Sequence, residues 1–71
     1  MRLAFENREF QIRNHKDLWG LLRLIEINLP TTVEIGTDIA SYREKVDTHS
    51  DLFALANRIN SLKGEDGDWR D

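Results

Sequence analysis

Two copies of the phrase His-x-Asp-Leu hold the side chains in this 71-residue chain that could do chemistry. His15 and Asp17 belong to the first copy, and His49 and Asp51 to the second, 34 residues further on. Imidazole and carboxylate are ordinary zinc ligands, and imidazole titrates near neutral pH. A metal or acid–base site would require all four side chains to converge on one pocket.

The neighbouring residues favour a different role for the repeated phrase. Each aspartate stands three residues after a helix-capping residue, Asn14 in the first copy and Thr48 in the second. In the first turn of a helix, a carboxylate accepts free backbone N–H groups and complements the helix dipole. We also expect the two helices to be antiparallel, which separates their starts. The sequence therefore predicts helix caps, with no catalytic or metal-binding residue.

Other enzyme classes also lack their usual residues. Ser50 neighbours His49, but adjacent helical residues do not face each other, so no nucleophile relay follows. The four glycines are scattered and form no phosphate-binding loop. The absence of cysteine removes thiol enzymes, thiolate zinc sites and disulfide scaffolds, and it fits a reducing cytosol. We expect a protein without enzymatic activity or cofactor.

Hydrophobic periodicity predicts the elements that surround these residues. Alternating apolar residues indicate a β-hairpin over residues 3–12 and a strand near 31–35. Apolar residues at helical spacing predict helices at about 15–28 and 49–63, which end near Pro30 and Gly64.

Residues 39–47 fit either a strand or a helix by periodicity alone. Superposing the two phrases places Ile12–Asn14, the end of a strand, over Val46–Thr48, which favours a strand at 41–47. The predicted fold is α+β with the order ββα–ββα: a four-stranded, mainly antiparallel sheet with both helices on one face. Either a duplication or the common preferences of helix starts explains the repeat.

The chain is short enough for only one core, which we assign to residues 1–64. The tail at 65–71 holds four acids and one base of the chain's thirteen acids and ten bases, which leaves nine of each in the body. Because it lacks aliphatic and β-branched residues, we expect the tail to be disordered. Trp69 is its exception, and it either folds back onto the domain or anchors a partner.

The first predicted helix is more apolar than one core face requires. Gly20, Leu24 and Ile27 form a second stripe that must be covered. Either the second helix or the 36–41 loop covers it, or it is the surface of a dimer or of a partner. Trp19 and Phe53 occupy equivalent positions after the two phrases, where we expect aromatic side chains to pack on the sheet.

We predict a protein–protein interaction module: a small inhibitor, an immunity-type protein or an adaptor that masks a larger target. Its expected contact residues are Gly20, Leu24, Ile27 and Trp69, and self-association is an open alternative. The N-terminus shows neither a signal peptide nor a membrane span, which favours the cytoplasm.

The alternative is a nucleic-acid-binding regulator that uses the basic residues of the first hairpin and helix. They are Arg2, Arg8, Arg13, Lys16 and Arg23. The balanced charge of residues 1–64 disfavours nucleic acid, because it supplies no positive field for the phosphate backbone.

Overall fold

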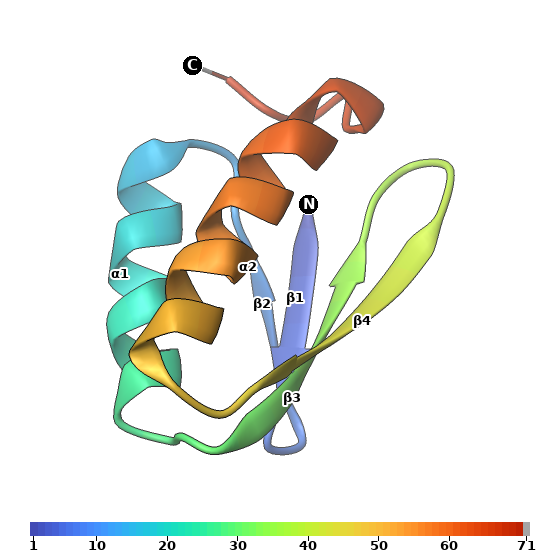
Figure 1. Cartoon of the computed structure of the whole chain (residues 1–71). Coiled ribbons are helices and arrows are strands. Elements are labelled where there is room, and N and C mark those ends of the chain that lie inside the picture. The colour runs from blue at the N-terminus through green and yellow to red at the C-terminus, as the bar shows by residue number, and fades with distance from the viewer. Residues whose placement is uncertain (71) are drawn as a thin grey trace.

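The computed structural model describes residues 1–70, which form a four-stranded sheet and two helices in the order ββαββα (Figure 1). The elements are β1 (Arg2–Phe5), β2 (Arg8–Gln11), α1 (His15–Glu26), β3 (Thr31–Gly36), β4 (Ser41–Val46), α2 (His49–Leu62) and the 3-10 turn η1 (Lys63–Glu65).

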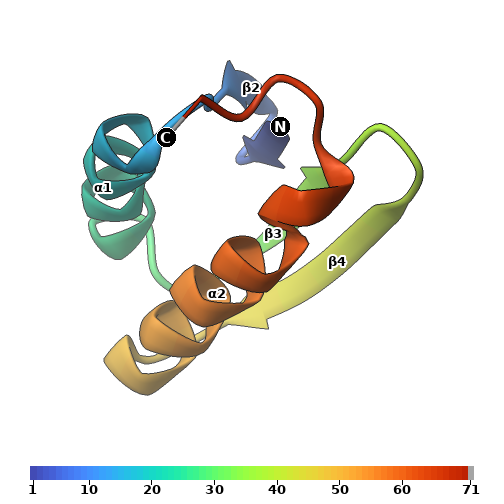
Figure 2. The same ribbon diagram turned by 90° about the horizontal axis from the view of Figure 1, so that it is seen from above.

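The sheet has the strand order β2-β1-β3-β4, and every neighbouring pair is antiparallel. Both helices cover one face of this sheet (Figures 1 and 2). The predicted α+β fold is confirmed, including the strand that the repeat favoured for the ambiguous segment. α1 ends at Glu26, two residues before the expected boundary at 28.

The two hairpins differ in their loops. Glu6 and Asn7 have φ angles of 51° and 61°, the left-handed pair that a two-residue type I′ turn requires. The second hairpin turns through residues 37–40, where the Thr37 hydroxyl oxygen accepts the N–H of Ala40 at 3.1 Å. The second ββα half is the longer one, because its loop, each of its strands and its helix exceed their counterparts by two residues.

The core lies between the sheet and the helices. Leu3, Val33 and Ile35 of the central strands are fully buried and pack with Ile25 of α1 and Ile59 of α2. Alternate strand residues face the other way because side chains alternate across a strand. That second face of the sheet has no covering layer within residues 1–70 (Figure 2).

The C-terminal segment crosses one end of the core toward α1 (Figure 2). Glu65 accepts hydrogen bonds from the hydroxyls of Tyr42, at 2.8 Å, and Thr37, at 3.1 Å. Trp69 packs against the core, and the Arg70 N–H donates to the Arg13 carbonyl at 2.7 Å. We call residues 63–70 the strap.

This packing differs from the disordered tail expected over 65–71; Asp71 lies outside the described residues. Composition suggested disorder because the segment has no aliphatic residue. The strap is nevertheless held by long-range partners, since buried Asp66 meets the Met1 ammonium at 2.6 Å. Trp69 also meets the ring of His15 edge-on at 5.3 Å, as the fold-back alternative for this residue anticipated.

The two tryptophans provide a matched test of this arrangement. We expect Trp69→Ala to lower the free energy of unfolding by about 2 kcal/mol, because it leaves a cavity against the core. Trp19→Ala removes an exposed side chain, so its effect should stay within about 0.5 kcal/mol. Urea unfolding monitored by circular dichroism measures both. Equal losses, or a larger loss from Trp19→Ala, would contradict the packing described here.

Candidate functional site

The repeated His-x-Asp-Leu phrase begins both helices, as predicted. In the first copy, the Asn14 side chain accepts the Asp17 N–H at 2.8 Å, and the Asp17 carboxylate accepts the Arg13 N–H at 3.0 Å. In the second copy, the Asp51 carboxylate accepts the N–H groups of Asp47, at 3.0 Å, and Thr48, at 3.1 Å. Both aspartates are therefore engaged in helix capping.

The two helices run antiparallel (Figure 1). His15 and His49, the first residues of α1 and α2, therefore lie at opposite ends of the helical layer. His15 Nε2 lies 3.3 Å from the side-chain oxygen of Asn60, near the end of α2. His49 Nε2 lies 2.9 Å from the Glu26 carboxylate, at the end of α1. No group of three or more metal-ligating side chains occurs within residues 1–70. The structure thus does not bring the four polar side chains of the phrases together.

These two contacts are equivalent in the internal repeat. Asn60 follows Glu26 by 34 residues, the same offset that relates His49 to His15. Each histidine therefore joins the first turn of its own helix to the last turn of the other, and the sequence repeat corresponds to an approximate two-fold relation between the helices.

Between these two contacts, an apolar groove runs along the junction of α1 and α2. Two hollows of about 240 and 260 Å³ lie along it, and both are lined by Trp19, Phe53 and Ala56. The side chain of Trp19 is 60% exposed and that of Phe53 is 66% exposed. We call this junction the interhelical groove.

The expectation that Trp19 and Phe53 pack on the sheet was wrong. Leu18 and Leu52, the residues just before them, point into the core instead. One residue advances a helix by about 100°, so the following side chain turns away from the sheet. The rotation could have been read from the sequence by measuring each aromatic against the buried stripe of its helix.

The predicted second stripe of α1 is also uncovered. Ile27 is 77% exposed, Leu24 is 36% exposed, and a β-carbon at Gly20 would meet no atom within 4 Å. Neither α2 nor the 36–41 loop covers the stripe, which was one of the two alternatives. These residues form a second exposed apolar stripe on the outer side of α1. We call the groove and this stripe together the helical face.

The acidic and basic side chains of the two helices differ in whether they have partners. Asp17, Glu26 and Asp51 are the only acids of α1 and α2, and each accepts a hydrogen bond or ion pair described above. By contrast, neither Lys16 nor Arg23 forms an ion pair or side-chain hydrogen bond within residues 1–70. Helical spacing places both beside Trp19 and Gly20 on the helical face.

The predicted nucleic-acid surface is divided by the fold. Lys16 and Arg23 share the helical face, whereas Arg2 lies on the opposite face of the sheet, where its guanidinium lies across Gly36. Arg8 lies over the ring of Phe10, with 5.4 Å between the guanidinium carbon and the ring centroid. The five basic residues therefore form no single continuous surface.

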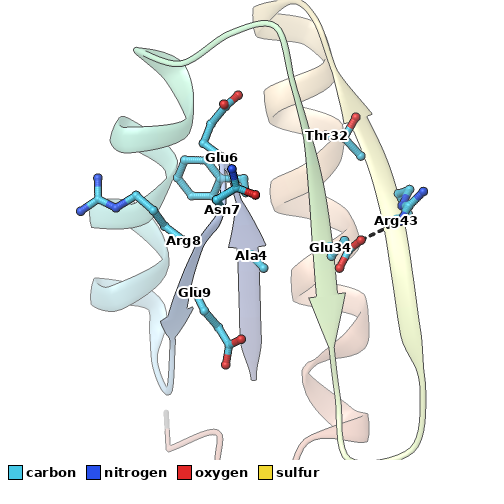
Figure 3. Close-up of a pocket in the computed structure, with 9 residues that line it drawn as sticks. Ala4, Glu6, Asn7, Arg8, Glu9, Thr32, Glu34 and Arg43 are labelled. Carbon is cyan, nitrogen blue, oxygen red and sulfur yellow. Dashed lines mark hydrogen bonds and ion pairs between the residues drawn. The ribbon is translucent and has the colours of Figure 1, made fainter.

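The uncovered sheet face contains a polar hollow of about 520 Å³ above Ala4 (Figure 3). Glu9 and Glu34 flank Ala4 on the neighbouring strands, and Arg43 pairs with Glu34 at 2.7 Å. Both members of this pair are more than half exposed. The hollow arises because a small residue stands among long ones, and its only ion pair is open to solvent.

Comparison with known proteins identified no relative: no family model, curated protein or solved structure matches this chain. Within residues 1–70, neither helix is both long and apolar enough to cross a membrane.

The cap of α2 makes a prediction for acid unfolding. Backbone hydrogen bonds from Asp47 and Thr48 lower the pKa of Asp51 in the folded state. Its stabilising contribution is therefore complete above the unfolded pKa, about 3.9, and is lost as the pH falls through the lower folded value. Asp51→Asn should consequently destabilise the chain more at pH 6 than at pH 2, as measured by urea unfolding at both pH values. A constant difference would show that the Asp51 charge contributes nothing.

Proposed function

We propose that this chain is a non-enzymatic protein–protein interaction module that acts as a small inhibitor or adaptor, with the helical face as its contact surface. The observation that carries the proposal is the exposure of Trp19 and Phe53 on either side of one apolar groove. We place this activity in the cytoplasm, because the chain contains no cysteine.

Because these aromatic side chains lie outside the core, their burial does not contribute to the free energy of folding of this small domain. Burying a large apolar side chain contributes roughly 1.5–3 kcal/mol, and a chain of this size builds only one thin core. Contiguous exposed apolar surface marks interaction sites, and tryptophan is enriched among the residues that dominate binding energy. A partner that buries Trp19 and Phe53 would recover this free energy.

The aromatic side chains of the helical face are also held on a rigid scaffold in the unbound chain. Trp19 and Phe53 project from two helices that are capped, packed on the sheet and joined at both ends by histidine contacts. Side chains held on a rigid scaffold lose less conformational entropy on association. Trp69 was predicted as a further contact residue, but because it packs on the core we leave it out of the proposed surface.

Site-specific photocrosslinking in cells of the source organism tests the proposal. A photoreactive phenylalanine analogue at Phe53 should form an adduct with a defined target, and Trp19→Ser should reduce its yield. The same analogue at Lys45, on the uncovered sheet face, is the matched control and should not capture that target. Adducts at Lys45 alone, or equal capture at both positions, would overturn the proposal.

Substitutions in the second stripe of α1 test whether these residues serve binding or folding. Because Leu24 and Ile27 are exposed, the double variant Leu24→Asp, Ile27→Asp should remain folded, with unfolding free energy changed by about 1 kcal/mol or less. In this variant, the photoreactive analogue at Phe53 should capture less of the target. Circular dichroism and the crosslinking yield measure the two effects. An unfolded variant would instead show that these residues belong to the core.

A further inference from the structure

The unpaired charges of the helical face identify the kind of partner. We propose that the interhelical groove binds an acidic amphipathic helix of the target protein, whose apolar stripe packs between Trp19 and Phe53 and whose carboxylates pair with Lys16 and Arg23. This inference rests on the proposed function and adds the chemistry of the partner.

The sign of the charge follows from the residues already described. The chain as a whole has a net charge of −3, yet the three acids of its helices are committed to backbone N–H groups or to His49. Lys16 and Arg23 are left with no ion pair or side-chain hydrogen bond to any of residues 1–70. The helical face therefore presents two cations that a partner's carboxylates could neutralise, and complementary charge favours an acidic segment.

The outward surface of α2 contributes no opposing charge. Phe53, Ala54, Asn57 and Asn60 follow one another along its exposed side, and all are uncharged. An acidic segment would therefore meet cations along α1 and neutral residues along α2. A basic segment would face Lys16 and Arg23, and Glu26, the carboxylate that lines the groove, is already in contact with His49 at 2.9 Å.

The backbone of the groove favours a helix over a strand as its occupant. Both walls are α-helices, whose backbone N–H and C=O groups are already paired along their length. An extended peptide would find no ladder of partners there, whereas a helix satisfies its own backbone groups and needs only a place for one apolar face. The 12 residues of α1 span about 18 Å, which suits an occupant of about three turns.

Two synthetic helical peptides test the proposal with the full chain. Both carry leucines at helical spacing; one has glutamate at every flanking position and the other has lysine. Fluorescence of Trp19 in a Trp69→Phe chain reports binding. We expect the acidic peptide to bind about tenfold more tightly, because its glutamates form ion pairs with Lys16 and Arg23, whereas the lysines of the other peptide are repelled by them.

Charge reversal locates the site. Lys16→Glu with Arg23→Glu should reverse the preference between the peptides, whereas Arg43→Glu with Lys45→Glu makes the same change in net charge on the opposite face and should leave it unchanged. Equal affinity for both peptides, binding of neither, or equal effects of the two double variants would overturn the inference. Tighter binding of a DNA duplex or of anionic phosphatidylserine vesicles would also overturn it, in favour of that ligand.

The two proposals fail in distinguishable ways. If Phe53 captures a target in cells but the acidic peptide shows no preference, the helical face binds proteins and the inference about acidity is wrong. If neither Phe53 nor Lys45 captures a target, the proposed function itself fails.

Discussion

The pairing of the Met1 ammonium with the Asp66 carboxylate determines how this small domain closes. The ammonium and the carboxylate lie 2.6 Å apart, and the side chains of Met1 and Asp66 are 0% and 2% exposed. The ammonium also donates to the Ile12 carbonyl at 3.1 Å, so one buried group joins the start of β1, the end of β2 and the strap. Buried pairs add little net stability, but leaving one member without its partner costs several kcal/mol. The pair therefore fixes where the strap must lie.

The position of the strap then determines which aromatic side chains are buried. With Asp66 fixed, Trp69 reaches the core beside His15, while Glu65 holds the second hairpin through Tyr42. One end of the core is thus closed from within the chain. Trp19 and Phe53, which project between the helices, receive no such cover. An apolar surface remains on the helical face, and the proposed function rests on it.

Sequence periodicity predicted the strands and helices because local spacing encodes them, and the repeated phrase resolved the segment that became β4. Capping by Asp17 and Asp51 was equally readable, since it depends on residues three or four positions apart. The packing of the strap could not be predicted from the sequence, because its partners are distant along the chain and its own composition is polar. The exposure of Trp19 escaped prediction because the aromatic residue type was given more weight than its angle on the helix.

Acrylamide quenching of single-tryptophan variants tests most directly which of the two tryptophans is exposed to solvent. Trp69→Phe leaves Trp19 as the only emitter, and Trp19→Phe leaves Trp69. The indole N–H of Trp69 is buried without a hydrogen-bond partner in residues 1–70, so phenylalanine can replace it without losing a bond. The account predicts that Trp19 is quenched nearly as readily as a free indole, while Trp69 is protected. Equal quenching, or protection of Trp19 instead, would contradict it.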